Sequence, residues 1–300
     1  MIRLVSLYDE AGLGRSLGQW LEARGQACRV EDGEIHRFPD GEIRLRLNGK
    51  PADVTVLVCS LDQPSEKTLA LVFAAELLRQ QGARRLLLVA PYLAYMRQDI
   101  AFHPGEGVSA ASYARLLSRY VDGLVTVDPH LHRIPQLEQV YRVPCQALHA
   151  TTILGEWLKT QLTGPALLIG PDRESEQWVT AVAQECGQPC LVFDKERLGD
   201  RQVEIRVPDL RERGLATTMV LVDDMVSTGH TLMKVARALR EQGFTDIRAV
   251  CVHALYGEDT AAAMADSGLK EVASCNTVRH PGNRLDVTAL LGQGVLRWRG

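Results

Sequence analysis

The sequence predicts an α/β protein of two similar domains, each a mostly parallel sheet flanked by helices. Apolar runs of strand length alternate with amphipathic segments, a pattern typical of parallel strands joined by helices. The same order of elements occurs twice along the chain, and 300 residues exceed the usual size of one hydrophobic core. The 46% content of apolar residues is that of an ordinary globular protein.

Five of the expected strands are the apolar runs at residues 3–7, 54–59, 86–90, 167–170 and 219–222. The helices after the first two strands of each half end near a glycine, which adopts the positive φ of a helix C-terminus more easily than other residues. These glycines are Gly25 and Gly82 in the first half and Gly187 and Gly243 in the second.

The two halves are predicted to be a duplication. The spacing between corresponding glycines is almost the same, and Leu78–Gly82 resembles Leu239–Gly243. One such pair of glycines alone is best explained by chance similarity. Two pairs separated by nearly the same number of residues favour duplication. We expect one domain at 1–146 and a second at 147–300. Whether the last residues of the chain return to the N-terminal domain is left open.

The composition argues against several classes of protein. The 34 basic and 37 acidic residues give a net charge of −3, without the basic surplus typical of nucleic-acid or membrane-surface binding. No apolar run approaches the ~20 residues of a membrane span, and charges interrupt the N-terminus too early for a secretory signal. The seven cysteines lack C-x-x-C spacing, which argues against a disulfide framework or a zinc site. We therefore expect a cytoplasmic protein.

A candidate phosphate site follows the strand at 219–222. The strand leads into Asp223 and Asp224 and then into a loop and a helix, a position where backbone N–H groups can bind phosphate. The two carboxylates could accept hydrogen bonds from neighbouring sugar hydroxyls. The loop residues expected to bind a sugar phosphate are Ser227, Thr228, Gly229, His230 and Thr231.

The alternative is an acidic turn whose Ser and Thr side chains cap the helix. Adjacent aspartates at the end of an apolar strand make this alternative weaker. The corresponding strand end of the first half carries Cys59 and Ser60 in place of the acids, so we expect the site in the second half alone.

The run Val222–Asp224 with Thr228 and Gly229 resembles the phosphoribosyl-diphosphate loop shared by phosphoribosyltransferases and ribose-phosphate pyrophosphokinases. The transferases carry one such domain, whereas this chain has two similar halves. The resemblance therefore favours the pyrophosphokinase family, with two phosphoribosyltransferase-like domains, and extends in order over essentially the whole chain to Arg279–Pro281.

The segment Phe38–Glu42 is expected to be a turn that enters an exposed strand. An aromatic face can stack on a purine and carboxylates can accept from its exocyclic amine, although spacing alone favours a turn with a core phenylalanine. The segment is similar to the family's Phe-x-Asp-Gly-Glu text, which contacts adenine across a subunit interface. The resemblance thus implies ATP-binding roles for Phe38, Asp40 and Glu42 and a homodimer or hexamer.

The segment Pro91–Asp99 follows the strand at 86–90. Its Arg, Gln and Asp could bind a nucleotide, or form a solvated loop with a structural ion pair. The segment is similar to the family's Pro-Tyr-x-x-Tyr-x-Arg-Gln-Asp motif, and that resemblance implies ATP-binding roles for Arg97 and Gln98.

Two further strand ends carry candidate cation ligands. Asp128 and His130 match the family's Asp-x-His text, which implies that His130 contacts ATP and Mg²⁺; His132 gains no role from it. Asp172, after the strand at 167–170, suits Mg²⁺ or a helix cap equally well by position, and the resemblance favours the metal. The charged residues at 173–176 depart from the family's small ones.

Lys195 and Arg197 follow another expected strand and open a polar stretch, 198–206, that suits a mobile flap. Such a pair is usually only solvated charge. It matches the family's Lys-x-Arg on a catalytic loop, which implies catalytic roles for both residues and a sugar-phosphate contact for Arg197.

The implied reaction transfers diphosphate from MgATP to the 1-hydroxyl of ribose 5-phosphate. His230 and Ser227 depart from the family's usual residues, which leaves another pentose phosphate open as substrate. Three alternative functions remain open. The first is a non-catalytic relative, which should lack Lys195, Arg197 or the aspartates, and the second is a transferase, which would not need the segments at 38–42 and 97–99. The third is a scaffold that binds ATP without turnover.

Overall fold

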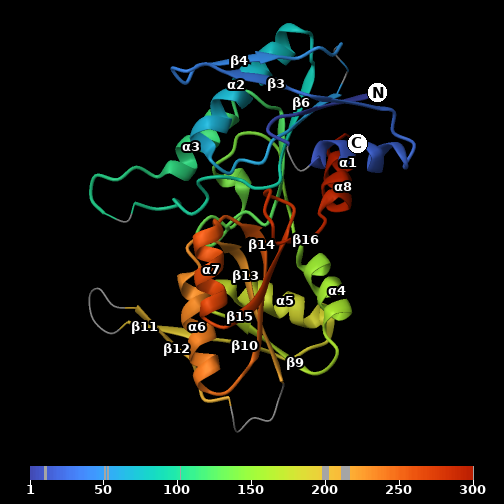
Figure 1. Cartoon of the computed structure of the whole chain (residues 1–300). Coiled ribbons are helices and arrows are strands. Elements are labelled where there is room, and N and C mark those ends of the chain that lie inside the picture. Colours follow the sequence, from blue (N-terminus) through green and yellow to red (C-terminus); the bar gives the residue numbers. More distant parts are fainter. Residues whose placement is uncertain are drawn as a thin grey trace. The chain divides into compact units, whose positions relative to one another are not determined.

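The computed structural model describes residues 1–9, 12–50, 52, 54–101, 103–197, 203–210 and 217–299. The chain forms two compact units, one of Met1–His149 with Val287–Gly300 and one of Ala150–Asp286 (Figure 1). Among the described residues no helix has the length and apolar character needed to cross a membrane. All seven cysteines are described, and none is in a disulfide.

Unit 1 is a parallel sheet between two layers of helices. Its six strands lie in the order β2-β1-β5-β6-β7-β8, with helices α2 and α3 on one face and α1 and α8 on the other (Figure 1). The strands are β1 (Ile2–Ser6), β2 (Cys28–Asp32), β5 (Val54–Val58), β6 (Arg85–Ala90), β7 (Gly123–Val127) and β8 (Cys145–Leu148). The helices are α1 (Leu13–Glu22), α2 (Pro64–Gln80), α3 (Ser109–Leu117), a 3₁₀ turn (Leu137–Gln139) and α8 (Thr288–Arg299).

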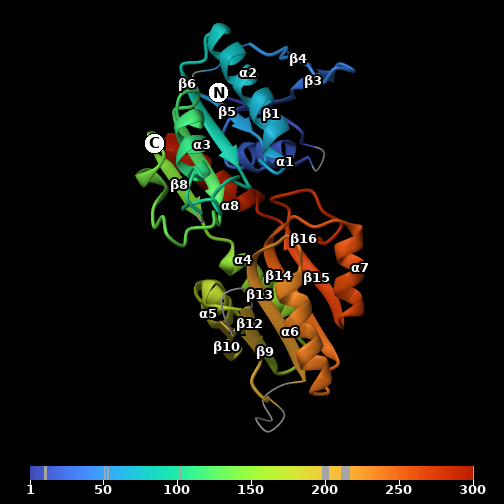
Figure 2. The same cartoon turned by 90° about the vertical axis from the view of Figure 1, so that its left-hand side faces the viewer.

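Unit 2 repeats this arrangement. Its six strands lie in the order β10-β9-β13-β14-β15-β16, with α6 and α7 on one face and α5 and α4 on the other (Figures 1 and 2). The strands are β9 (Ala166–Gly170), β10 (Cys190–Val192), β13 (Thr218–Val226), β14 (Asp246–Ala254), β15 (Leu269–Cys275) and β16 (Asn283–Leu285). The helices are α4 (Thr151–Gln161), a 3₁₀ turn (Arg173–Ser175), α5 (Glu176–Cys186), α6 (His230–Glu241) and α7 (Glu258–Asp266).

The central strands of both sheets are continuous apolar runs because helices cover both faces of a parallel sheet. Every residue of β5 and of β9 is buried, for example. The four glycines expected to close helices all have positive φ. The prediction of two similar parallel-sheet domains is therefore confirmed, down to the same order of strands in each sheet.

The similarity between the two units also includes a hairpin in each. In unit 1, β3 (Glu34–Arg37) and β4 (Ile43–Arg46) are inserted between β2 and β5, and this hairpin extends beyond the sheet (Figure 2). In unit 2, β11 (Asp194–Arg197) and β12 (Val203–Arg206) are inserted at the equivalent place, between β10 and β13. The two hairpins carry the segments expected to bind adenine and to catalyse transfer.

In each half of the chain, the helix after the last strand does not pack on the sheet of that strand's unit. The helix that follows β8, the last strand of unit 1, is α4 and belongs to unit 2. The helix that follows β16, the last strand of unit 2, is α8 and returns to unit 1, where it packs on α1 and on β7. Unit 2 is therefore one continuous stretch of chain, whereas unit 1 is completed by a helix that follows unit 2 in the sequence.

Glycines allow α8 to approach the sheet of unit 1 closely. A Cβ added to Gly123 in β7 would lie 2.1 Å from Trp298 Nε1, and one added to Gly294 would lie 2.7 Å from a Val125 methyl group. The Trp298 ring is also covered by the guanidinium of Arg85, 4.3 Å from the ring centroid. Side chains at these glycines would displace the helix.

We expect Gly123→Ala to lower the free energy of unfolding by about 1–3 kcal/mol, since overpacking a filled interface forces rigid groups apart. Urea unfolding monitored by tryptophan fluorescence would measure it. Gly107→Ala is the matched control, because nothing lies within 4 Å of a Cβ there, and it should not destabilise the protein. Equal losses in both variants would contradict the close approach of α8.

Candidate active site

Three carboxylates gather at the carboxyl-end edge of the sheet in unit 2. The neighbouring parallel strands β9 and β13 end at this edge, with Leu221 opposite Ile169 in the register. Asp172 follows β9, while Asp223 and Asp224 lie in β13. Burial, together with the charges of Asp224 and then Asp172, raises the pKa of Asp223 well above its ordinary value. Hydroxyl donors or a cation bound here would relieve this repulsion.

The strand at 219–222 is longer than the sequence predicted. It runs to Val226, because β14 is itself nine residues long and pairs with Asp223, Met225 and Val226 through Cys251, His253 and Ala254. The apolar pattern stops at Asp223, whereas the backbone ladder does not depend on side-chain polarity. The two aspartates therefore stand on a strand, and the Asp224 N–H donates to Asp223 Oδ1 at 3.0 Å.

The candidate phosphate loop is short and leads directly into α6. Ser227 and Thr228 follow β13, and Gly229 is the N-cap of α6 with φ 66°. A Cβ at Gly229 would lie 2.9 Å from Met264 Sδ, so this position needs glycine for both its backbone conformation and its space. The first N–H groups of α6, from His230 and Thr231 onward, point out of the helix end as an anion site requires.

His230 is exposed at the first position of α6, and Ser227 is partly exposed. The histidine therefore stands on the solvent side of the helix start. Whether the two departures from the family's usual residues alter the choice of sugar phosphate stays a prediction.

Lys195 and Arg197 lie in β11, the first strand of the hairpin in unit 2. In the antiparallel register they stand opposite Ile205 and Val203 of β12. The last part of the stretch 198–206, which was expected to suit a mobile flap, is strand β12 from Val203 to Arg206, since its alternating Val-Glu-Ile-Arg sequence pairs with β11. The remaining residues of the stretch, 198–202, lie outside the described residues.

In unit 1, Phe38, Asp40 and Glu42 form the turn of the β3–β4 hairpin. The Phe38 N–H donates to the Glu42 carbonyl at 2.8 Å, and the Glu42 N–H donates to Asp40 Oδ1 at 3.1 Å. All three residues are exposed, and the ring of His36 meets the Phe38 ring edge-on at 4.7 Å. The expected turn is present, but Phe38 is not a core residue, so its ring can stack on a planar ligand.

The loop after β6 presents Arg97 and Gln98 at the surface and buries the next residue, Asp99. The Gln98 N–H donates to the Tyr95 carbonyl at 2.9 Å, and Tyr95 adopts a φ of 63° that is unusual for its type. Arg133 Nη1 donates to both oxygens of Asp99, at 3.1 and 3.4 Å. The structural ion pair left open by the sequence therefore exists, beside two exposed candidate ligands.

The loop after β7 carries Asp128 and His130. Asp128 is buried with φ 34°, and its Oδ1 lies 2.9 Å from Nδ1 of His149. This hydrogen bond raises the pKa of His149, against the opposing effect of burial. His130 is partly exposed, and its ring lies edge-on to that of His132 at 4.1 Å.

Asp172 is a helix cap, the alternative that its position had left open. Its Oδ1 accepts the Ser175 N–H at 3.2 Å, and the Ser175 hydroxyl donates to the Asp172 carbonyl at 2.6 Å. A carboxylate can accept further bonds, so capping does not exclude a cation. Mg²⁺ prefers oxygen ligands, so by donor chemistry Asp172, next to the other two carboxylates, fits this ion better than the imidazole of His130 does.

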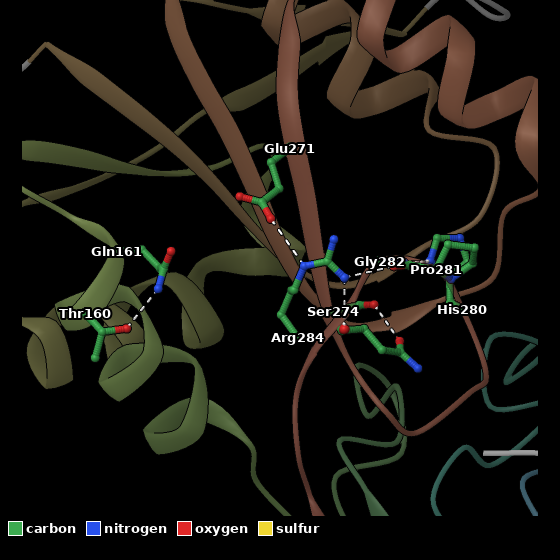
Figure 3. A network of polar contacts seen from close by, with 9 residues as sticks. Thr160, Gln161, Glu271, Ser274, His280, Pro281, Gly282 and Arg284 are labelled. Atoms are coloured by element: carbon green, nitrogen blue, oxygen red, sulfur yellow. Dashed lines mark hydrogen bonds and ion pairs between the residues drawn. The ribbon is translucent and has the colours of Figure 1, made fainter.

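The segment Arg279–Pro281 lies in the connection between β15 and β16. Polar contacts hold His280 and Pro281 of this segment (Figure 3). The Gly282 N–H donates to His280 Nδ1 at 2.9 Å, so Nε2 carries the proton that faces the Tyr256 carbonyl at 3.2 Å. Burial lowers the pKa of His280, which keeps the ring neutral. Arg284 Nη1 donates to the Pro281 carbonyl at 2.9 Å.

Arg133 and His149 were not among the sequence-based candidates. Each pairs with an acid far away in the chain, and no local spacing links them to Asp99 or Asp128. The only guide to these pairs from the sequence was the general rule that loops following neighbouring parallel strands meet at one edge of the sheet.

The fold and the acidic strand end with its phosphate loop define the class of phosphoribosyltransferase-like α/β proteins. Residues 4–120 match the family model described as the N-terminal domain of ribose phosphate pyrophosphokinase, and residues 136–288 match the phosphoribosyl transferase domain. The chain belongs to the ribose-phosphate pyrophosphokinase family.

Individual proteins agree with this assignment. The chain is 35% identical to a ribose-phosphate pyrophosphokinase from Methanopyrus kandleri over 94% of each chain. It is 30% identical to one from Thermococcus kodakarensis, over 89% of this chain and 92% of the relative. Its fold is similar to that of a phosphoribosylpyrophosphate synthetase from Mycobacterium smegmatis, with a TM-score of 0.83 and 22% identity over 100% and 99% of the two chains.

Proposed function

We propose that the chain is a ribose-phosphate diphosphokinase. It transfers the β,γ-diphosphoryl group of MgATP to the 1-hydroxyl of ribose 5-phosphate and yields 5-phosphoribosyl 1-diphosphate and AMP. The observation that carries the proposal is the acidic strand end of β13 running into the glycine-capped start of α6, in a chain that matches relatives of this name over almost its whole length.

The sugar phosphate binds at the edge of the sheet in unit 2. Asp223 and Asp224 accept hydrogen bonds from the sugar hydroxyls, which offsets the repulsion between the carboxylates. The 5-phosphate binds the backbone N–H groups and hydroxyls of the loop from Ser227 to Thr231, where the partial positive charge of the α6 N-terminus favours an anion.

ATP binds through the exposed residues of unit 1. The Phe38 ring stacks on adenine, while Asp40 and Glu42 accept from its exocyclic amine. Arg97, Gln98 and His130 bind the nucleotide from the loops after β6 and β7. Because the β3–β4 hairpin is exposed, it can reach the nucleotide of a second copy, so the active form is a homodimer or a hexamer with a shared adenine site.

The chemical step is an in-line attack of the sugar's 1-oxygen on the β-phosphorus. The bond from that phosphorus to the α,β-bridging oxygen breaks, and AMP leaves with this oxygen. Lys195 and Arg197 stabilise the charge that develops on the phosphoryl oxygens. His130 and Asp172 would hold Mg²⁺, which would supply positive charge to the bound triphosphate. The reaction consumes ATP and a sugar phosphate, both of which are found in the cytoplasm. We therefore propose that the protein is cytoplasmic.

An AMP-release assay with purified protein, MgATP and ribose 5-phosphate tests the proposal. We expect AMP in the presence of sugar and no comparable release without it, and a ³¹P NMR spectrum should show a diphosphate attached to the sugar. Parallel reactions with other pentose 5-phosphates measure the effect of the departures at Ser227 and His230. Absence of sugar-dependent AMP over a range of phosphate and divalent-metal concentrations would overturn the proposal.

A further inference from the structure

We propose that Arg133 and His149 are positioning residues for ATP, each holding a buried carboxylate that fixes a loop with candidate ATP ligands. Neither residue is assigned a role by the family resemblance. The inference rests on the proposed function, because it concerns the nucleotide site of that reaction.

The first pair joins the loops after β6 and β7. The Asp99 side chain is 2% exposed, and Arg133 Nη1 approaches its two oxygens while the Arg133 side chain remains 47% exposed. Asp99 directly follows Arg97 and Gln98 in the chain. Fixing its carboxylate therefore fixes the backbone from which both exposed ligands extend.

The second pair joins the loops after β7 and β8. The Asp128 side chain is fully buried, and its Oδ1 contacts Nδ1 of His149, whose side chain is 67% exposed. Asp128 lies two residues before His130. Its φ of 34° is uncommon for an aspartate, so the surrounding contacts must hold the backbone in that conformation.

Together the pairs form a brace along one sheet edge. Strands β6, β7 and β8 are neighbours in that order, and in each pair the acid on one loop is held by a basic side chain from the next loop. Backbone bonds continue the ladder past the strand ends, from Val127 N to the Pro91 carbonyl and from Asp128 N to the Leu148 carbonyl. The loops thus behave as one platform.

Removing either side chain takes one hydrogen-bond partner from a buried carboxylate. A buried carboxylate that loses a partner is destabilised, and it relieves this by moving toward water. That movement displaces Gln98 or His130, and a displacement of about 1 Å at a binding group is enough to lower catalysis about 100-fold. The brace therefore acts on ATP binding through the loops and does not itself touch the nucleotide.

A merely structural ion pair offers the matched control. Arg79 Nη2 lies 2.7 Å from Asp122 Oδ2, and the same oxygen accepts the Leu86 N–H at the amino ends of β6 and β7. Arg79 lies in α2, so this pair joins the end of that helix to the residue before β7, at the ends of the strands opposite to the brace. Arg79→Ala should therefore lower the melting temperature without changing the affinity for ATP.

The test compares Arg133→Ala, His149→Ala and Arg79→Ala in the full-length protein. Binding of α,β-methylene-ATP with Mg²⁺ is measured by calorimetry, and KM is measured separately for MgATP and ribose 5-phosphate. We expect the first two variants to weaken analogue binding and raise KM for MgATP about 10-fold or more, with KM for ribose 5-phosphate unchanged within about twofold.

Conservative variants keep the test decisive if an alanine variant does not fold. Asn places its amide near the position of Nδ1 in histidine, whereas Gln places it near Nε2, so His149→Asn should restore binding and His149→Gln should not. Arg133→Lys, which keeps the charge, should restore binding in part. Analogue affinities in the Arg133 and His149 variants equal to that of Arg79→Ala would overturn the brace, whereas no analogue binding by the unmodified protein would refute the proposed function itself.

Discussion

Replacing Lys195 with alanine is expected to lower kcat for sugar-dependent AMP formation by about 100- to 1,000-fold, the usual effect of removing one group that stabilises transition-state charge. Lys195 lies in the β11–β12 hairpin, inserted between β10 and β13, and β13 carries the acidic pair. A cation that acts mainly in the transition state changes kcat more than KM. Steady-state AMP release with both substrates saturating measures the effect.

Lys159→Ala is the matched control for this prediction. Lys159 Nζ pairs with Glu185 at 3.2 Å on the surface of the same unit, and half of its side chain is exposed. Such a pair contributes little, so kcat should stay within about twofold. If Lys195→Ala kept more than about a third of the original kcat, the catalytic cation would have to be sought elsewhere.

The fold could be predicted from the sequence because its signals are local. Continuous apolar runs identify buried parallel strands, and helix-ending glycines such as Gly82 and Gly243 mark equivalent places in the two halves. The extension of β13 through Val226 could not be predicted in this way, since it depends on pairing with β14, a strand that begins at Asp246. The apolar pattern of a sequence indicates only which side chains are buried, and the backbone pairing of β13 continues beyond those residues.

The candidate site was predictable where its residues are close in sequence. The acidic pair and the αL glycine before α6 lie within one short segment, so their chemistry can be inferred from the sequence alone. Asp172 was ambiguous because a carboxylate at a strand end serves as a cap and as a cation ligand equally well. The partners of Asp99 and Asp128 come from other loops, and only the order of strands in the sheet brings them together.

The Asp223→Asn variant should bind ribose 5-phosphate less tightly and yet be more stable than the original protein. Loss of a charge-assisted hydrogen bond of about 1.5–3 kcal/mol corresponds to a KM for the sugar about 10- to 100-fold higher. Burial, with the charges of Asp224 and Asp172, raises the pKa of Asp223, so its ionised form disfavours the folded state. A neutral amide removes that penalty, and about 1 kcal/mol would raise Tm by ~2–4 °C.

The sign of this stability difference can be checked by pH. An acid whose pKa is raised on folding destabilises the folded protein above that pKa, so the advantage of Asp223→Asn should be largest at neutral pH. It should shrink as pH falls through the raised pKa toward the ordinary value of 3.8, because Asp223 then becomes protonated in the folded state. Differential scanning calorimetry from pH 8 to pH 4 would follow it.

Asp246→Asn, at the amino end of the neighbouring strand, should behave in the opposite way. Partial burial acts to raise the pKa of Asp246, but hydrogen bonds from Arg248 and Thr218 outweigh it, so the pKa is lowered. Its ionised form therefore supports folding above the ordinary pKa, and Asp246→Asn should lower Tm at neutral pH and leave KM for the sugar unchanged. If both variants lowered Tm, repulsion among the three carboxylates would not be the dominant force at the edge where the sugar is proposed to bind.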